Sequence, residues 1–229
     1  LCSSDFGRSL EESRDDLQSL GYDTPVPLIR SDSYTTLLDA TNPDIRRRLL
    51  ASGLELFYAR GVNATGVKEI ADRAHVPKAA FYTYYESKEA FVVAVLEQYW
   101  LELQDRSGSL LLGRGRPVRR LQRYFAVIAD EHERHTFMRG CLIGNLALEV
   151  SATSASVHEK LRGIVCAWEH ELAAVFTEGT PQRRREVAGL IIEAWEGAVL
   201  RARIDRTRAP YDRFSRITLP QLVGLVGTS

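Results

Sequence analysis

Residues 66–85 hold a dense set of side chains that could bind nucleic acid. Four of them fall on one face of a short helix, with Tyr84 at its end: Lys78, Ala79, Tyr82 and Thr83. Lysine and hydroxyl groups bind phosphate oxygens, and an alanine methyl group can contact the methyl group of thymine. Because exposed aromatic side chains on so short a helix have few other uses, this face favours contact with double-stranded DNA.

Two short helices joined by a tight turn must position this face. The first helix has one apolar side, formed by Val67, Ile70, Ala71 and Ala74. Phe81 and Tyr85 are four residues apart and would bury the inner side of the second helix. His75 stands in the turn, where a positive φ suits glycine better, so we expect slight strain there. With Pro77 at the first position of the second helix, the pattern predicts a helix-turn-helix, whose second helix enters the major groove of DNA.

Helical spacing of apolar residues continues after Pro43 almost without interruption. Asn42 is a suitable N-cap for a helix that stops at Gly61, and Ser87 is a suitable N-cap for a long helix that extends to Gln104. Further helices are expected over residues 118–135, 140–150, 156–177, 183–204 and 211–226. Since no segment alternates with a period of two, we predict an all-α protein of about nine helices.

Composition and charge fit a globular protein but do not by themselves indicate a ligand. The chain has 229 residues, 45% of them hydrophobic and 26% charged, and its formal net charge is zero. Residues 1–43 carry three basic and eight acidic side chains, whereas residues 44–90 carry eight basic and six acidic ones. We therefore expect residues 1–41 to be an acidic, mostly flexible extension with one short helix at Leu10–Leu20.

The sequence also argues against several other classes of protein. Cys2, Cys141 and Cys166 are too few and too far apart for a disulfide framework or a clustered zinc site. No apolar run approaches the roughly 20 residues of a membrane span, and the N-terminus lacks the pattern of a secretory signal. We therefore expect a cytoplasmic protein that has no membrane partner, metal or cofactor.

Motifs of catalysis are weak. Residues 61–66 have the glycine spacing of a phosphate loop, but no strand precedes them. His132 and His135 lie three residues apart without an identifiable third metal ligand, so we expect both at the surface. No nucleophile elbow or metalloprotease motif occurs. An enzyme is therefore not expected, and a helical enzyme is kept only as an alternative from another class.

Residues 44–99 resemble the DNA-binding domain of the tetracycline-repressor (TetR/AcrR) family of bacterial transcriptional regulators. The resembling residues are Ile45, Leu49, Ala51, Leu54, Phe57 and Gly61, then segments 64–71, 76–85 and 87–90. The chain departs from the family pattern at His75, which replaces Gly, at Pro77, which replaces Ser or Thr, and at Tyr85, which replaces Phe. The resemblance implies an N-terminal three-helix DNA-binding domain (42–102) that a long helix joins to a C-terminal helical domain (103–229).

The resemblance also implies DNA contacts, position by position. Contacts with the phosphate backbone would come from Thr65, Lys78, Tyr84 and Lys88, with Gly66 beside Thr65 at the DNA. Base or mixed contacts would come from Ala79, Ala80, Tyr82 and Thr83. Phe81 and Tyr85 would hold the recognition helix against the first helix of the domain.

In this family the C-terminal domain dimerises and holds a small-molecule effector. Segments 139–149 and 194–198 resemble one subset of such domains. An apolar pocket with a few polar groups could be lined by Tyr124, Ile128, Phe137, Cys141, Asn145, Trp168 and Trp195. For each of these residues, the alternative is an ordinary core position. The dimer surface is expected on the last two helices, at Ile191, Ile192, Trp195, Val199 and Leu200.

These expectations converge on a dimeric repressor that binds a palindromic operator. A small-molecule effector would release it from DNA by tilting the long helix over residues 87–104. Within the same class, the alternatives are an activator and a regulator without an effector. A further alternative is a redox or electrophile sensor that acts through Cys141, although an inert buried cysteine is the more common case.

Overall fold

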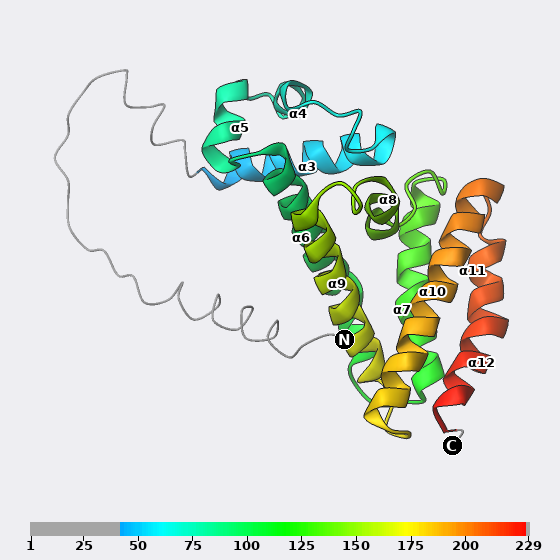
Figure 1. Ribbon diagram of the computed structural model, residues 1–229. Helices are drawn as coiled ribbons and strands as arrows, with labels where there is room; N and C mark the ends of the chain where they lie inside the picture. The colour runs from blue at the N-terminus through cyan, green and yellow to red at the C-terminus, as the bar shows by residue number, and fades with distance from the viewer. Residues whose placement is uncertain (1–41, 228–229) are drawn as a thin grey trace, which may run out of the picture.

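The computed structural model describes residues 42–227, so the expected extension over residues 1–41 and its helix at Leu10–Leu20 lie outside the described range. Within that range the chain is helical apart from turns and loops, which confirms the predicted all-α class (Figure 1). The elements are α3 (Pro43–Arg60), α4 (Val67–Arg73), α5 (Lys78–Tyr84), α6 (Lys88–Ser107), η2 (Gly108–Leu111), α7 (Pro117–Arg134), α8 (Leu142–Glu149), α9 (Ala155–Ala173), α10 (Pro181–Asp205), α11 (Ala209–Arg213), η3 (Phe214–Thr218), α12 (Leu219–Gly224) and η4 (Leu225–Gly227).

Helix α3 begins and ends where the sequence predicts. The side chain of Asn42 accepts a hydrogen bond from the backbone N–H of Asp44 (2.9 Å), and Pro43 occupies the first turn, where its missing N–H costs nothing. The helix ends at Gly61, whose φ of 83° is a conformation that glycine adopts without steric penalty. The N-cap at Ser87 is confirmed too, because its side chain accepts from the N–H of Ala90 (3.0 Å).

The helix-turn-helix unit packs around the ring of Phe91, which lies on α6. The ring centroid of Phe91 is 6.0 Å from that of Phe57, 5.0 Å from that of Phe81 and 4.8 Å from that of Tyr85. A Cβ atom at Gly53 would lie only 2.4 Å from this ring, so α3 can accept it only at a glycine. Phe81 and Tyr85 therefore anchor α5 to α6 directly, and to α3 through Phe91.

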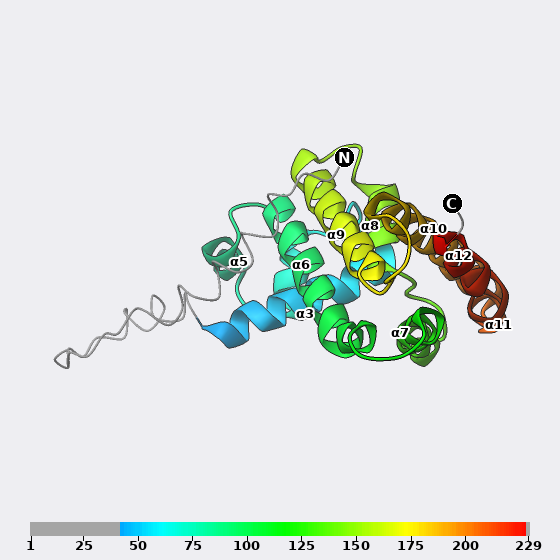
Figure 2. The same cartoon turned by 90° about the horizontal axis from the view of Figure 1, so that it is seen from below.

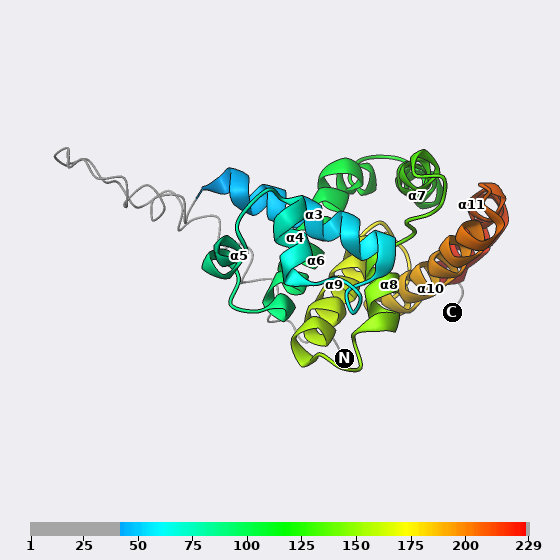
Figure 3. The ribbon, with the colours of Figure 1, turned by 90° about the horizontal axis from the view of Figure 1, so that it is seen from above.

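Helix α6 belongs to both halves of the molecule. It packs against α3 of the helix-turn-helix unit and against α9 and α7 of the C-terminal half. Because the helix is continuous from Lys88 to Ser107, it crosses the predicted domain boundary at residues 102–103. Seen from below and above, α10 and the α11–α12 segment lie side by side at the edge of the molecule farthest from α5 (Figures 2 and 3).

The C-terminal segment differs from the single helix predicted over residues 211–226. Helix α11 is followed by one π-helical turn (Phe214–Thr218) and only then by α12. Pro220 lies just after the wide turn; it cannot donate a backbone hydrogen bond, and in a regular helix its ring would clash with the carbonyl of Arg216. The wider turn accommodates this proline without ending the helical path.

The C-terminal half is built around the indole ring of Trp195. Its centroid lies 4.7 Å from the ring of Phe125, 4.9 Å from that of Tyr211 and 5.3 Å from that of Phe214. Trp195 is 1% exposed, so this cluster ties α7, α10 and the C-terminal segment together. None of the helices within residues 42–227 is long and apolar enough to cross a membrane.

Candidate nucleic-acid interface and ligand cavity

The turn before the recognition helix has the backbone conformation expected from the sequence. His75 has a φ of 55°, in the left-handed region where residues other than glycine are strained. The predicted strain is therefore confirmed. Its N–H donates to the carbonyl of Asp72 (3.1 Å), and the N–H of Val76 donates to that of Ala71 (3.0 Å). Pro77 stands one position earlier than expected, as the N-cap of α5.

Helix α5 presents the predicted face to solvent. Tyr82 is 51% exposed although it is a large aromatic side chain. The other exposed members of this face are Lys78, Ala79 and Thr83. Ala80 and Tyr84 are half-buried, and the Tyr84 hydroxyl donates to the carbonyl of Asn42 (3.2 Å), so these two also hold α5 in place.

Thr65 and Lys88 are placed differently from the expectation. The Thr65 side chain is 1% exposed, and its hydroxyl donates to the carbonyl of Gly61 (2.6 Å). The Lys88 ammonium donates to the carbonyl of Val62 (2.6 Å), and partial burial lowers its pKa. Both groups serve the turn between α3 and α4. Because the Thr65 side chain is buried, its expected phosphate contact needs correction, whereas the phosphate contact expected from the half-buried Lys88 stays a prediction. Gly66, by contrast, is exposed at the start of α4.

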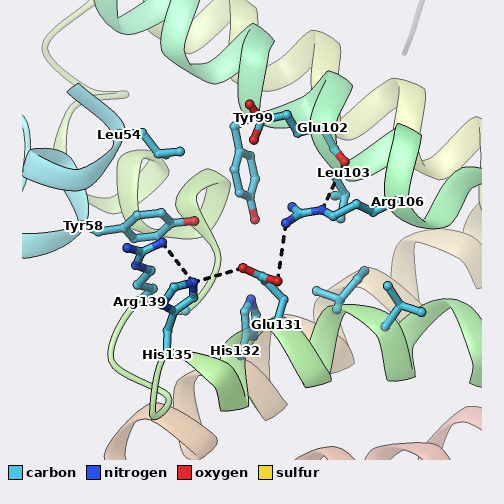
Figure 4. Close-up of a pocket in the computed structure, with 13 residues that line it drawn as sticks. Leu54, Tyr58, Tyr99, Glu102, Leu103, Arg106, Glu131, His132, His135 and Arg139 are labelled. Carbon is cyan, nitrogen blue, oxygen red and sulfur yellow. Dashed lines mark hydrogen bonds and ion pairs between the residues drawn. The ribbon is translucent and has the colours of Figure 1, made fainter. Parts of the chain in front are cut away.

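A cavity of about 120 Å³ lies between the two halves of the molecule (Figure 4). Leu54 and Tyr58 of α3 form one wall, while α6, α7 and the loop at Arg139 form the others. The lining residues are Leu54, Tyr58, Tyr99, Glu102, Leu103, Arg106, Val127, Ile128, Glu131, His132, His135, Arg139 and Gly140. The lining combines apolar walls with several ionisable groups.

Charged groups on one side of this cavity form a continuous row of polar interactions. Oε2 of Glu131 forms an ion pair with the Arg106 guanidinium (3.6 Å), and Oε1 of Glu131 lies 3.0 Å from Nε2 of His135. The Arg139 guanidinium lies 3.1 Å from the same Nε2 and 5.3 Å from the ring centroid of Tyr58. As Figure 4 shows, this row of interactions extends from α6 across α7 to the side chains of α3.

Comparison with known proteins places both halves of the chain. The family model for bacterial regulatory proteins of the tetR family matches residues 49–95, and the model for the C-terminal domain of LmrA/YxaF-like transcriptional regulators matches residues 117–217. The chain is 36% identical over 187 residues to the HTH-type transcriptional repressor DhaR of Mycobacterium sp. strain GP1, an alignment that covers 78% of this chain and 92% of DhaR.

The chain belongs to the TetR family of bacterial regulatory proteins. It is also 33% identical to the transcriptional regulator AcuR of Cereibacter sphaeroides, over 73% of this chain and 80% of AcuR. The crystal structure of a regulatory protein TetR from Rhodobacter sphaeroides matches with a TM-score of 0.68 at 31% identity, over 78% of this chain and 98% of that one. Reduced Escherichia coli NemR matches with a TM-score of 0.67 at 28% identity, over 81% and 100%.

The pocket residues expected from the TetR-family resemblance are only partly brought together. Ile128 lines the cavity, whereas Tyr124, Trp168 and Trp195 are buried within the C-terminal half. The Tyr124 hydroxyl and the Trp168 indole N–H have no well-formed hydrogen bond within the described part of the chain. The other expected residues lie at the loop before α8 or on it: Phe137, Cys141 and Asn145.

Cys141 precedes α8 and is 4% exposed. Burial raises the pKa of its thiol well above the usual value, and the nearby carboxyl of Glu196 raises it further. The thiol is therefore protonated at neutral pH, whereas a reactive cysteine requires the thiolate.

His132 does not lie at the surface as expected. Its ring is 4% exposed, and Nδ1 lies 2.7 Å from the Tyr211 hydroxyl. Burial lowers its pKa to about 4, with a smaller opposing effect of the Glu131 carboxylate. The periodicity of α7 could have indicated this, because His132 follows Ile128 by four residues on the buried side.

The residues expected at the dimer surface also need correction. Ile191, Ile192, Trp195 and Val199 are at most 7% exposed within the single chain, so they form its own core. Leu200, in contrast, is 57% exposed. An apolar stripe on a helix marks the side that is buried, and the sequence does not tell whether the same chain or a second copy buries it.

Proposed function

We propose that this TetR-family regulator is a repressor that binds a palindromic operator as a homodimer and leaves it when a small molecule binds. DhaR and NemR are both named transcriptional repressors. The observation that carries the proposal is the exposed side of α5, where Lys78 and Tyr82 extend into solvent from a helix that is anchored on its other side. As a bacterial transcriptional regulator, the protein would act in the cytoplasm, where the chromosome lies.

A second copy of the chain would cover the exposed apolar side chains near the C-terminus. They lie on α10 and the C-terminal segment and comprise Leu190, Leu200, Ile204 and Ile217, which are 38–65% exposed. Large apolar side chains gathered on one edge are typical of protein interfaces. A two-fold dimer formed there would present two copies of α5 to two half-sites of an operator.

The effector would occupy the cavity and extend from it towards the C-terminal half. Ser107 follows Leu103 by one turn of α6, and Tyr124 precedes Ile128 by one turn of α7, so both lie one turn beyond the residues that line the cavity. At that end, the polar atoms of Tyr124 and Trp168 are buried without a well-formed hydrogen bond in the described range. The Tyr124 hydroxyl also interacts with Ser107 and with Trp168, so a polar group of the ligand would join an existing polar cluster there.

The test is sequence-specific binding to DNA from upstream of the gene, measured by fluorescence anisotropy at several salt concentrations. We expect binding that weakens steeply with salt, and a labelled operator that is released by at least one compound of a metabolite library. Tyr124→Phe should lower the potency of such a compound while leaving operator affinity unchanged. Absence of sequence-specific binding at every salt concentration would overturn the proposal.

A further inference from the structure

Helix α8 lies directly below the end of α3, close to the turn that leads into α4 (Figures 1 and 3). Its last residue, Glu149, accepts hydrogen bonds from this turn with both carboxylate oxygens, a contact that we call the clasp. The N–H of Val62 donates to Oε2 (3.0 Å), and the N–H of Asn63 donates to Oε1 (2.6 Å). Hydrogen bonds from two backbone amides to one carboxylate are charge-assisted and restrict its position strongly.

The turn is shaped to receive this carboxylate. A Cβ atom at Gly61 would lie 2.5 Å from Oε2 of Glu149, and φ at Gly61 is 83°, so a side chain at this position would both be strained and displace the carboxylate. Lys88 donates to the carbonyl of Val62 (2.6 Å), and its ammonium interacts electrostatically with Glu149. The backbone of Val62 is therefore held on both sides: Glu149 of the C-terminal half accepts from its N–H, and Lys88 of α6 donates to its carbonyl.

The N-terminal half of α8 is attached to α10. The Arg203 guanidinium donates to Oδ1 of Asn145 (2.8 Å). A Cβ atom at Gly144 would lie 2.6 Å from Oε2 of Glu196, so α8 and α10 approach each other closely at this glycine. Helix α8 therefore connects α10, which carries exposed apolar side chains, with the helix-turn-helix unit.

We infer that Glu149 is the positioning residue that fixes the orientation of the helix-turn-helix unit and thereby sets the half-site spacing that the protein accepts. Helix α6 is one connection between the two halves, and because Phe91 packs the helix-turn-helix unit onto its first turns, the unit follows any tilt of α6 against the C-terminal half. The clasp at Glu149 is a second attachment, on the turn at the far end of α3. The Arg139 guanidinium over the Tyr58 ring supports the same end of α3. The inference rests on the proposed binding of a palindromic operator by a dimer.

The experiment compares Glu149→Gln with the wild type on a set of operators. Their half-sites are identical, and the central spacing is changed by one or two base pairs, each of which rotates one half-site by about 35°. Glu159→Gln is the matched control, because it removes the same charge from an exposed residue whose carboxylate pairs with Arg162 on the same helix. Operator affinity is measured by anisotropy, together with affinity for a single half-site.

We expect the wild type and Glu159→Gln to lose affinity sharply when the spacing changes. Glu149→Gln should bind the best operator about tenfold more weakly, accept altered spacings with little further loss, and bind a single half-site as the wild type does. Glu149→Asp keeps the charge but shortens the side chain, so it should fall between the two. Amide hydrogen exchange at Val62 and Asn63 should accelerate in Glu149→Gln.

Two outcomes would overturn the inference. If Glu149→Gln discriminates between spacings as strictly as the wild type, the carboxylate only stabilises the turn, even where amide exchange accelerates. If single half-site affinity falls as much as operator affinity, Glu149 acts on the recognition helix itself and not on the relative placement of two helices. Failure of the wild type to bind any palindrome would instead remove the proposed function on which the inference rests.

Discussion

At the scale of single residues, the reactivity of Cys141 distinguishes a repressor that is released by a small molecule from a redox or electrophile sensor. Its thiol is buried, and its pKa lies well above the usual value. We expect the native protein to modify Cys141 with N-ethylmaleimide at least about 100-fold more slowly than the urea-unfolded chain, with a rate that rises as pH increases towards the raised pKa. Peptide mapping by mass spectrometry measures this site separately from Cys2 and Cys166. Rapid modification in the native state would favour the sensor alternative.

The buried His132 makes the free energy of unfolding depend on pH, and its lowered pKa fixes the direction of that dependence. The folded pKa of about 4 lies below the usual 6.5, so the folded protein binds fewer protons than the unfolded chain in that range. The stabilising contribution is present above pH 6.5 and is lost as pH falls from 6.5 to 4, by about 3 kcal/mol in total. Urea unfolding at pH 7.5, 6.0 and 5.0 should show this loss in the wild type and a smaller one in His132→Gln. Equal slopes for both proteins would contradict the assignment.

Residue roles could be predicted from the sequence only where local geometry decides them. The exposed side of α5 follows from helical spacing alone, and so does the strain at His75. The inward positions of Thr65 and Lys88 depend on a turn that is also held by Glu149, which lies more than 80 residues away along the chain. No periodicity in the sequence reports such a contact.

At the scale of elements, the turn between α4 and α5 can be tested by relieving its strain. Glycine adopts the left-handed conformation of residue 75 without the steric cost that histidine bears. We expect His75→Gly to raise the free energy of unfolding by about 1 kcal/mol, and His75→Val to lower it by at least as much. Urea denaturation monitored by circular dichroism measures both. A destabilised His75→Gly protein would mean that the imidazole makes a compensating contact.

Element boundaries were predictable where caps are encoded locally. Asn42, Pro43 and Gly61 delimit α3 as expected, and Ser87 starts α6. The apolar periodicity over residues 211–226 predicts a continuous helix, whereas the structure has a π-helical turn just before Pro220. Of the cavity lining only Ile128 was predicted, since α3, α6 and α7 meet there only after the chain has folded.

At the scale of the whole molecule, the dimer is the feature to test. Ile204 is 65% exposed on α10, and burying a glutamate against a second copy would be strongly unfavourable. We expect Ile204→Glu to raise the dimer dissociation constant at least about tenfold and to move the sedimenting mass towards the 25.8 kDa of one chain. Leu112→Glu is the control, because Leu112 is 75% exposed in the loop after η2. A variant that remains dimeric would exclude this side of α10 as the interface.

The position of Phe91 bears on how this protein is made. The aromatic ring that packs α3 against α5 in the DNA-binding unit lies on α6, after all three helices of the unit in the sequence. During synthesis from the N-terminus, α3, α4 and α5 emerge first but have no finished interior to condense upon. Stable folding of this unit must therefore wait until the first turns of α6 have left the ribosome. A nascent chain stalled before Phe91 would expose the apolar sides of its three helices to chaperones and proteases.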